Sequence, residues 1–346
     1  MIKTVCFNKR ENCLELIDQT ALPVRETIVK CYSETDVAEA IKTMVVRGST
    51  AIGITAGYGI YLGLQKATEQ NFKSTLNNVC DLIAGVRPTS VNLFCTIHRV
   101  KEAVSSCTSA KEAVERALSE ADKIFEEDLA MCRAIGVFGQ EVMEDGTAWL
   151  THCNAGALAT SGYGTALGIF RTAKEAGKNV KIFVNETRPL LQGARLTAWE
   201  LQKEGFDVTV IADNTAGSLI REGKINGVVV GADCVTSKGF VVNKVGTYPL
   251  AVLCKYNGIP FYVAVPATAF DMSLKYDDEI VIEQSDSKEM CFFNGVQVIP
   301  EGVNVYNPAF DITPPELITG IITDKGIIEP IYGENIPVVL GLEKED

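Results

Sequence analysis

Two residues of this chain, Cys153 and Asp233, each have a chemical type and a local setting that could serve chemistry, one as a thiol and the other as a carboxyl group at the end of a strand-like run. Cys153 ends a strand-like run at residues 147–153 and precedes a glycine-rich turn and an expected helix, whose N-terminus would favour a thiolate. Asp233 follows an apolar run at residues 228–232, so we expect it at the edge of the core, where desolvation favours a protonated carboxyl group. Such a pair could donate and accept protons. A buried structural cysteine and a turn-capping carboxylate are the alternatives.

Basic and small polar residues before two other expected helices suit an anionic ligand. Arg47, Gly48 and Ser49 precede an apolar helix, and the free amide groups of a helix N-terminus attract phosphate. Arg87 stands before another helix in the same way, and the ammonium group of Lys244 could neutralise an anion. For each single basic residue the alternative is a solvated surface position. Taken alone, none of these motifs identifies a phosphate site.

The second half of the chain contains the elements that would position these residues. Short β-branched runs predict strands at residues 147–153, 180–185, 208–212, 227–232 and 261–265. The helices between them should end near glycines, which tolerate the left-handed conformation of a helix end, at Gly177, Gly205, Gly223 and Gly258. Strands and helices in alternation predict an α/β fold with a Rossmann-like, doubly wound parallel sheet. Ligands bind beyond the carboxyl ends of such strands, where we expect Cys153, residues 186–188, Asp213, Asp233, Asn243 and Lys244.

Two of these residues carry a more specific expectation. For Asp213 we favour a structural role as a cap of the turn that follows its strand. Lys244, together with Asn243, should stand at the start of the helix that precedes the strand at residues 261–265.

The first part of the chain follows a different pattern. Two β-like runs at residues 4–8 and 13–19 predict a hairpin. Helices are expected at residues 33–46, opened by a capping box, and at 51–66, 72–84, 90–105 and 109–135. We therefore expect a smaller N-terminal domain of a β-hairpin and helices over residues 1–140, and a Rossmann-like catalytic domain over residues 141–346.

The composition excludes several classes of partner. The 346 residues carry a net charge of −12, which argues against nucleic acid or an anionic membrane. The longest apolar stretch, residues 51–64, is too short and too rich in glycine to span a bilayer. The eleven cysteines form no Cys-x-x-Cys pair and no secretory signal precedes them, so we expect reduced thiols in a cytoplasmic protein. With two histidines and no ligand-like spacing, we expect no metal and no organic cofactor.

Eight segments, in order along the chain, resemble the methylthioribose-1-phosphate isomerase family. They are residues 47–53 (RGSTAIG), 87–93 (RPTSVNL), 151–160 (THCNAGALAT), 186–197 (ETRPLLQGARLT), 231–233 (GAD), 243–247 (NKVGT), 260–264 (PFYVA) and 306–311 (YNPAFD). The resemblance extends from about residue 40 to 330. The same superfamily includes 5-deoxyribose-1-phosphate isomerases, ribose-1,5-bisphosphate isomerases and the non-catalytic regulatory subunits of a translation-initiation exchange factor.

The resemblance implies an intramolecular aldose–ketose isomerase that acts, usually as a homodimer, on a sugar phosphorylated at C1. In it, Cys153 and Asp233 match the catalytic pair. The positions that hold the sugar phosphate are matched by Arg47, Gly48, Ser49, Arg87, Gln192, Asn243 and Lys244. Because the phosphate prevents spontaneous opening of the sugar ring, we assign protonation of the ring oxygen to Asp233 and make Cys153 a second acid–base group. Hydrogen would then move from C2 to C1 through an enediol or by a direct hydride shift, and the sequence leaves both routes open.

The chain departs from the family pattern at three places. Cys234 follows Asp233 where arginine is usual, Phe138 replaces a histidine, and residues 49–50 replace an Ala-Pro pair. These changes leave the 5-substituent of the sugar open, with 5-methylthioribose 1-phosphate as the family default and 5-deoxyribose 1-phosphate as the alternative. A ribose bisphosphate substrate carries a second phosphate group, which would require more positively charged residues in the site, so the replacements do not favour a bisphosphate isomerase. Two other classes of protein are alternatives. One is a non-catalytic regulatory module, which the retained catalytic pair argues against, and the other is a redox-responsive thiol protein.

Overall fold

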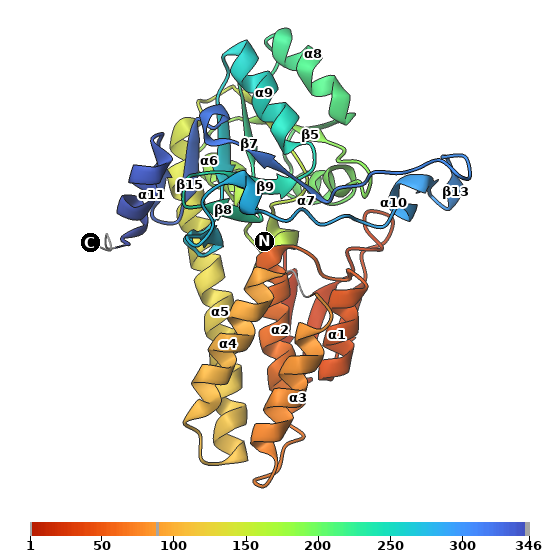
Figure 1. The fold of residues 1–346 in the computed structure, drawn as a ribbon, viewed down its shortest axis with the longest axis vertical. Coiled ribbons are helices and arrows are strands. Elements are labelled where there is room, and N and C mark those ends of the chain that lie inside the picture. The colour runs from red at the N-terminus through yellow and green to blue at the C-terminus, as the bar shows by residue number, and fades with distance from the viewer. Residues whose placement is uncertain (1, 88–89, 343–346) are drawn as a thin grey trace. The chain divides into compact units, whose positions relative to one another are not determined.

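The computed structural model describes residues 2–87 and 90–342, and their contacts divide the chain into two compact units (Figure 1). Unit 1 comprises Met1–Arg133 and Ala155–Leu167, and unit 2 comprises Ala134–Asn154 and Gly168–Asp346. The single boundary that we predicted between residues 140 and 141 differs from this division, since a short segment after residue 154 belongs to the first unit. Pro88 and Thr89, in the second family motif, lie outside the described residues.

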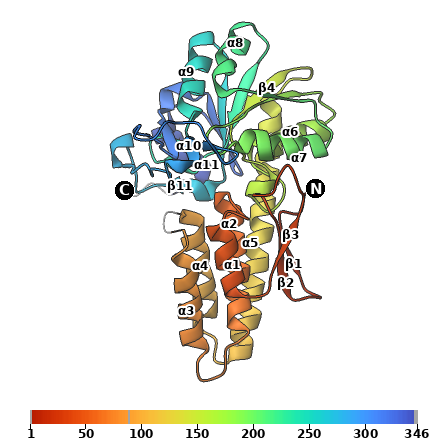
Figure 2. The same cartoon turned by 90° about the vertical axis from the view of Figure 1, so that its right-hand side faces the viewer.

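Unit 1 consists of a small sheet and long helices. Strands β1 (Val5–Asn8) and β2 (Cys13–Ile17) pair in antiparallel fashion and confirm the predicted hairpin, and β3 (Ile28–Cys31) adds a third strand that we did not predict. The helices are α1 (Glu34–Lys42), α2 (Ser49–Leu64), α3 (Phe72–Ala84), α4 (Val91–Ser105) and α5 (Ala110–Gly139). Figure 2 shows the strands alongside this helical bundle. All five predicted helices are confirmed.

In two helices of unit 1, the capping contact and the burial explain the sequence patterns from which we predicted them. The hydroxyl of Ser33 accepts a hydrogen bond from the backbone N–H of Asp36 at 3.2 Å, which confirms the predicted N-cap of α1. In α2, 14 of the 16 residues are buried, so a helix that is apolar on all sides forms the centre of the bundle.

The segment Ala155–Leu167 belongs to unit 1 because side chains of that unit hold its backbone. Thr4, Gln19 and Thr50 donate hydrogen bonds to the successive carbonyl groups of Ala157–Ala159, at 2.6, 2.7 and 3.1 Å. These donors lie more than a hundred residues earlier in the chain, so no local pattern could have revealed the attachment.

Unit 2 contains the predicted Rossmann-like sheet. Its seven strands lie in the order β16-β15-β10-β7-β4-β5-β6, and all neighbours pair in parallel except β15 and β16. The strands are β4 (Ala148–Thr151), β5 (Lys181–Asn185), β6 (Val208–Ile211), β7 (Gly227–Val230), β10 (Phe261–Ala264), β15 (Gly320–Thr323) and β16 (Gly326–Ile328). The first five confirm the predicted strands, and the last two were not predicted. The strand order reverses between β4 and β7, as in the dinucleotide-binding Rossmann fold.

The helices of unit 2 that we predicted to end near glycines do end there. They are α6 (Ala166–Glu175), α7 (Ala198–Lys203), α8 (Ala216–Arg221) and α9 (Thr247–Asn257), with α11 (Tyr332–Leu340) near the end of the chain. The glycine that follows each of the first four helices has a positive φ, between 69 and 82°. Among the described residues, no helix combines the length and the apolar character needed to cross a membrane.

The structure corrects our expectation for the chain after β7. In place of a helix, β8 (Cys234–Thr236) and β9 (Val241–Lys244) form a hairpin. With β11 (Phe270–Asp271) and β14 (Phe310–Thr313), this hairpin makes a second sheet in the order β11-β8-β9-β14. Asn243 and Lys244 therefore end a strand and do not open a helix. The valines of both strands suit a hairpin, and Gly239, with a φ of 85°, supplies the turn.

An irregular segment of unit 2, between β11 and β14, was not predicted at all. It carries a 3-10 helical turn at Asp277–Glu279 and the short elements α10 (Lys288–Cys291), β12 (Phe292–Phe293) and β13 (Val296–Gln297), the last two paired as a small hairpin.

Candidate active site

The predicted catalytic residues of unit 2 follow two adjacent strands at the same edge of the sheet. β4 and β7 pair in parallel with Leu150 opposite Val228. Cys153 comes shortly after the end of β4, and Asp233 comes shortly after the end of β7. The strand order reverses between these two strands, and open α/β sheets bind their ligands at this point. The predicted convergence of strand ends is therefore confirmed for this pair of strands.

Cys153 lies in a strained and firmly held turn. Its φ of 59° belongs to the left-handed region, which residues other than glycine seldom adopt, and the residue is only 8% exposed. Its backbone N–H donates to the hydroxyl of Thr187 at 2.9 Å, and its carbonyl accepts from the hydroxyl of Thr197 at 2.6 Å. The surrounding residues thus hold a conformation that the backbone alone would not prefer.

The loop after β5 provides one of these two contacts and is itself held by Asp213. Thr187, fully buried with a φ of 65°, donates its hydroxyl to the carbonyl of Asn185 at 3.1 Å. The carboxylate of Asp213 accepts from the N–H groups of Thr187 and Arg188, each at 2.8 Å. Asp213 is structural, as we expected, but it holds a neighbouring loop and not the turn after its own strand.

Gln192, which we predicted to bind substrate, lies at the end of the same loop. The residue is 7% exposed, and within the described part of the chain its side-chain oxygen has no hydrogen-bond partner. A π-helix, Gly193–Thr197, follows directly, and the backbone of Gly193 packs so closely that an added Cβ would overlap the carbonyl oxygen of Asn185. A buried amide oxygen without a partner is rare, so this atom is a suitable contact for a ligand hydroxyl group.

Asp233 is more exposed than the position at the edge of the core that we predicted. Its side chain is exposed, so the desolvation argument for this carboxyl group is wrong. Its backbone N–H donates to the carbonyl of Val242 at 2.9 Å, next to the first pair of the hairpin register, Cys234 opposite Val242. Cys234, which replaces the usual arginine, is half-buried, and burial raises the pKa of its thiol to about 11. That thiol is therefore protonated at neutral pH.

Asn243 and Lys244 lie where the second sheet passes into α9. The amide of Asn243 donates to the hydroxyl of Thr247 at 2.9 Å, and the ammonium nitrogen of Lys244 lies 4.9 Å from the ring centre of Phe310. The carboxylate of Asp311 accepts from the backbone N–H of Gly246 at 2.7 Å and from that of the second residue of α9 at 3.1 Å. Burial raises the pKa of Asp311 to about 6.

His152 is a structural residue of the site that the sequence did not reveal. Its Nε2 lies 2.9 Å from the carbonyl oxygen of Val245, and its Nδ1 lies 3.2 Å from the amide nitrogen of Asn185. Burial lowers the pKa of His152, and these partners fit a neutral ring with its proton on Nε2. The ring packs under Gly246, where an added Cβ would lie 2.8 Å from Cε1. The residue before Cys153 therefore joins β4 to β5 and to the turn before α9.

In unit 1, the predicted phosphate residues lie at the N-terminus of α2 and after α3. Gly48 caps α2 with a φ of 95°, and an added Cβ would lie 2.6 Å from the Cα of Ala159, so only glycine fits. The hydroxyl of Ser49 accepts from the amide of Asn92 at 2.7 Å. Arg47 and Arg87 are both half-buried. A long helix with a glycine cap presents free N–H groups, which suits an anion.

The fold and the edge of the sheet in unit 2 define a Rossmann-type α/β protein with a thiol and a carboxyl group at the switch point. The family model described as "Initiation factor 2 subunit family" matches residues 45–330. "Methylthioribose-1-phosphate isomerase 1" of Pseudothermotoga lettingae is 50% identical over 342 residues, which cover 98% of this chain and 99% of that protein. The methylthioribose-1-phosphate isomerase of Geobacter metallireducens is 50% identical over 328 residues, covering 93% and 95%.

Two solved structures extend the comparison. The 5-methylthioribose 1-phosphate isomerase of Pyrococcus horikoshii OT3 is 38% identical with a TM-score of 0.94, covering 99% of this chain and 97% of that one. A protein of A. fulgidus described as translation initiation factor eIF-2B, subunit delta, is 42% identical with a TM-score of 0.92, covering 99% and 100%. The chain therefore belongs to the initiation factor 2 subunit family and, within it, to the methylthioribose-1-phosphate isomerase family.

Proposed function

We propose that this chain converts 5-methylthioribose 1-phosphate into the corresponding 1-phosphoribulose with Cys153 and Asp233 as the acid–base pair. The observation that carries the proposal is that both residues follow adjacent strands at the point where the sheet order reverses. The names of the relatives that share about half of its residues over nearly its whole length agree with it.

The two side chains differ in a way that suits two roles. The carboxyl group of Asp233 is exposed, so an arriving sugar can reach it; to protonate the ring oxygen it must take up its proton once the bound sugar covers it from water, because exposure alone does not favour the protonated form. Cys153 is buried in a turn that is held on both sides, which suits transfer of hydrogen between C2 and C1 away from bulk water. The proton that Asp233 gives stays on the former ring oxygen as the C4 hydroxyl group of the product, and the hydroxyl proton released at C2 as the ketone forms restores the acid.

The residues proposed to bind the sugar phosphate are those that match the family motifs. They are Arg47, Gly48, Ser49, Arg87, Gln192, Asn243 and Lys244. The free N–H groups of α2 support the part played by residues 47–49, and the unpartnered oxygen of Gln192 supports a contact with a sugar hydroxyl group.

The test compares turnover of 5-methylthioribose 1-phosphate, 5-deoxyribose 1-phosphate and ribose 1,5-bisphosphate by one preparation. General acid–base groups contribute roughly 10²- to 10⁴-fold, so Cys153→Ala and Asp233→Asn should each lower kcat by at least about 100-fold. The matched controls are Cys95→Ala and Asp278→Asn, which change the same chemical groups at exposed positions and should keep full activity. Absence of turnover with all three sugars would exclude an isomerase.

A second measurement separates the two routes for hydrogen transfer. In D₂O, an enediol route places solvent deuterium on C1 of the product, whereas a direct hydride shift leaves C1 with the hydrogen that came from C2. Nuclear magnetic resonance of the product gives the answer directly.

A specific observation favours each of two alternative functions. The replacements at Phe138 and Cys234 favour 5-deoxyribose 1-phosphate as an alternative substrate. A higher kcat/KM for the 5-deoxy sugar than for the methylthio sugar would show that the 5-deoxy sugar is the preferred substrate. The likeness to the A. fulgidus protein, described as an initiation-factor subunit, favours a regulatory subunit, which would turn over none of the sugars. The homodimer and the cytoplasmic location stay predictions, to be checked by light scattering and by fractionation.

A further inference from the structure

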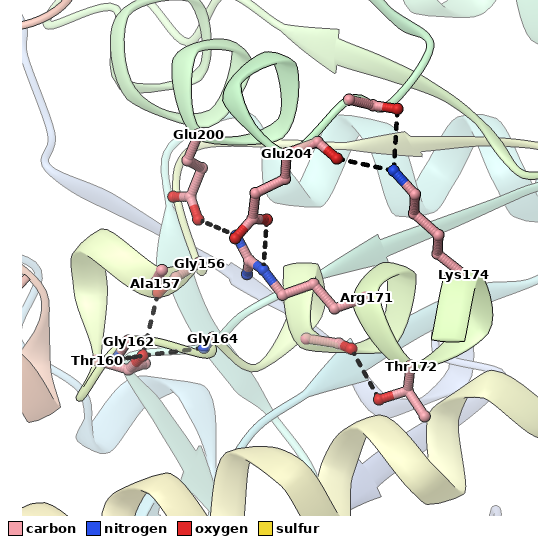
Figure 3. A network of polar contacts seen from close by, with 12 residues as sticks. Gly156, Ala157, Thr160, Gly162, Gly164, Arg171, Thr172, Lys174, Glu200 and Glu204 are labelled. Carbon is pink, nitrogen blue, oxygen red and sulfur yellow. Dashed lines mark hydrogen bonds and ion pairs between the residues drawn. The ribbon is translucent and has the colours of Figure 1, made fainter. Parts of the chain in front are cut away.

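A buried arginine of unit 2 forms ion pairs with two glutamates (Figure 3). Arg171 of α6 is 6% exposed, and its guanidinium group reaches two carboxylates of the chain around α7. Nη2 lies 2.7 Å from an oxygen of Glu200, which has no exposed surface, and Nε lies 2.7 Å from an oxygen of Glu204. Figure 3 shows the guanidinium group directed at both carboxylates.

From Glu200 a chain of hydrogen bonds leads to the backbone of Cys153. The other oxygen of Glu200 accepts from the amide of Asn154 at 2.6 Å. The same amide nitrogen lies 3.1 Å from the hydroxyl of Thr197, which donates to the carbonyl of Cys153 at 2.6 Å. All members of this chain are buried.

The Glu204 side of the network serves a different purpose. Lys174 donates to the carbonyl groups of Glu204 and Gly205 at 2.7 and 3.0 Å, and these contacts fix the end of α7 to α6 (Figure 3). Packing of the two helices is therefore secured without Glu200. Both glutamates pair with the same guanidinium group, but the chain of hydrogen bonds to Cys153 starts at Glu200, so the two form a matched comparison.

A buried ion pair is an expensive way to join two helices. Removing two charges from water costs about as much as their attraction returns, and apolar residues of similar volume often give equal or greater stability. Such a pair is best explained where it fixes a geometry. Cys153 needs this, because its left-handed backbone conformation persists only when its surroundings hold it.

We propose that Arg171 and Glu200 are positioning residues for Cys153. Their ion pair fixes Asn154 and Thr197, which together hold the carbonyl group of Cys153 and so the direction of its thiol. The proposal rests on the proposed function of Cys153 as an acid–base group. It does not make Arg171 or Glu200 a catalytic residue, because neither is placed to touch the sugar.

The experiment uses three variants of the full chain. Glu200→Gln removes the charge that fixes Asn154, and the double variant Arg171→Met/Glu200→Leu replaces the pair by apolar side chains so that the helices still pack. Glu204→Gln is the matched control, because it removes a carboxylate from the same guanidinium group. Each variant is assayed for kcat and KM, for its melting temperature, and for the pH dependence of alkylation of Cys153 by iodoacetamide, followed by peptide mass spectrometry.

Displacement of a reacting group by about 1 Å can cost 100-fold in rate, so Glu200→Gln and the double variant should lower kcat roughly 10- to 100-fold with KM within about twofold. The alkylation profile of Cys153 should move in both, whereas Glu204→Gln should keep the kcat and the profile of the parent. Parental kcat and profile in the double variant would overturn the proposal. So would a lower kcat with an unmoved profile, because the loss would then not arise at Cys153.

The alkylation profile also keeps the two proposals apart. If Cys153→Ala retains full turnover, the acid–base role of the thiol fails, and the profile alone then decides whether the ion pair positions Cys153.

Discussion

Replacing Thr187 by valine should destabilise unit 2 through two lost hydrogen bonds. The hydroxyl of Thr187 accepts from the backbone N–H of Cys153 at 2.9 Å and donates to the carbonyl of Asn185 at 3.1 Å, and the residue is fully buried. Valine has nearly the same shape, and both residues are branched at Cβ. The backbone strain at a φ of 65° is therefore the same in both proteins, and only the hydroxyl differs.

The size of the effect follows from the groups left without partners. A buried amide that loses its acceptor costs about 1–3 kcal/mol, and the lost hydrogen bond to the carbonyl of Asn185 costs about 1 kcal/mol more. The free energy of unfolding should therefore fall by roughly 2–4 kcal/mol. For a unit of this size, that corresponds to a fall of roughly 5–15 °C in Tm.

The assay is thermal and urea unfolding followed by circular dichroism, with Thr187→Ser as the control. Serine keeps the hydroxyl and loses one methyl group, which costs about 1 kcal/mol. Thr187→Val should therefore unfold at a clearly lower urea concentration than Thr187→Ser, with an unchanged m-value. Equal midpoints for the two variants would refute the reasoning, because the hydroxyl would then contribute nothing.

Two further predictions concern unit 1 and the pH dependence of unit 2. Gly48→Ala should lower the free energy of unfolding in urea by several kcal/mol, because the added Cβ would lie 2.6 Å from Ala159. The control Gly177→Ala has a similar φ and open space around the added Cβ, so it should lower the free energy of unfolding by only about 1–2 kcal/mol. Equal losses in the two variants would contradict this prediction. The pKa of Asp311 is about 6 in the folded protein against 3.8 as its ordinary value, so the folded state holds the proton more tightly. Its contribution to stability is then complete below about pH 4 and lost as the pH rises to 6, by roughly 2–3 kcal/mol. Asp311→Asn should remove this part of the pH dependence, and an unchanged curve of stability between pH 4 and 6 would show that another group causes it.

The features of the site that we could not predict from the sequence depend on hydrogen bonds between segments that are distant along the chain. Cys153 is held by Thr187 and Thr197, which lie 34 and 44 residues further along the chain. Nothing in the local pattern around Glu200 distinguishes a buried ion pair from an exposed glutamate of a helix. The exposure of Asp233 likewise depends on the hairpin after β7, which the local sequence pattern did not predict.

The sequence by itself determined the class of fold, the positions of five strands of the main sheet, the helix ends at glycines, and the family. These follow from local rules, since periodicity, glycine conformation and motif order are all properties of neighbouring residues. Only the tertiary structure decided that Ala155–Leu167 belongs to the first unit, that Asn243 and Lys244 end a strand, and that a buried ion pair leads to the backbone of Cys153. Each of these depends on which distant groups meet, and that is fixed by packing and by the need of every buried polar group for a partner.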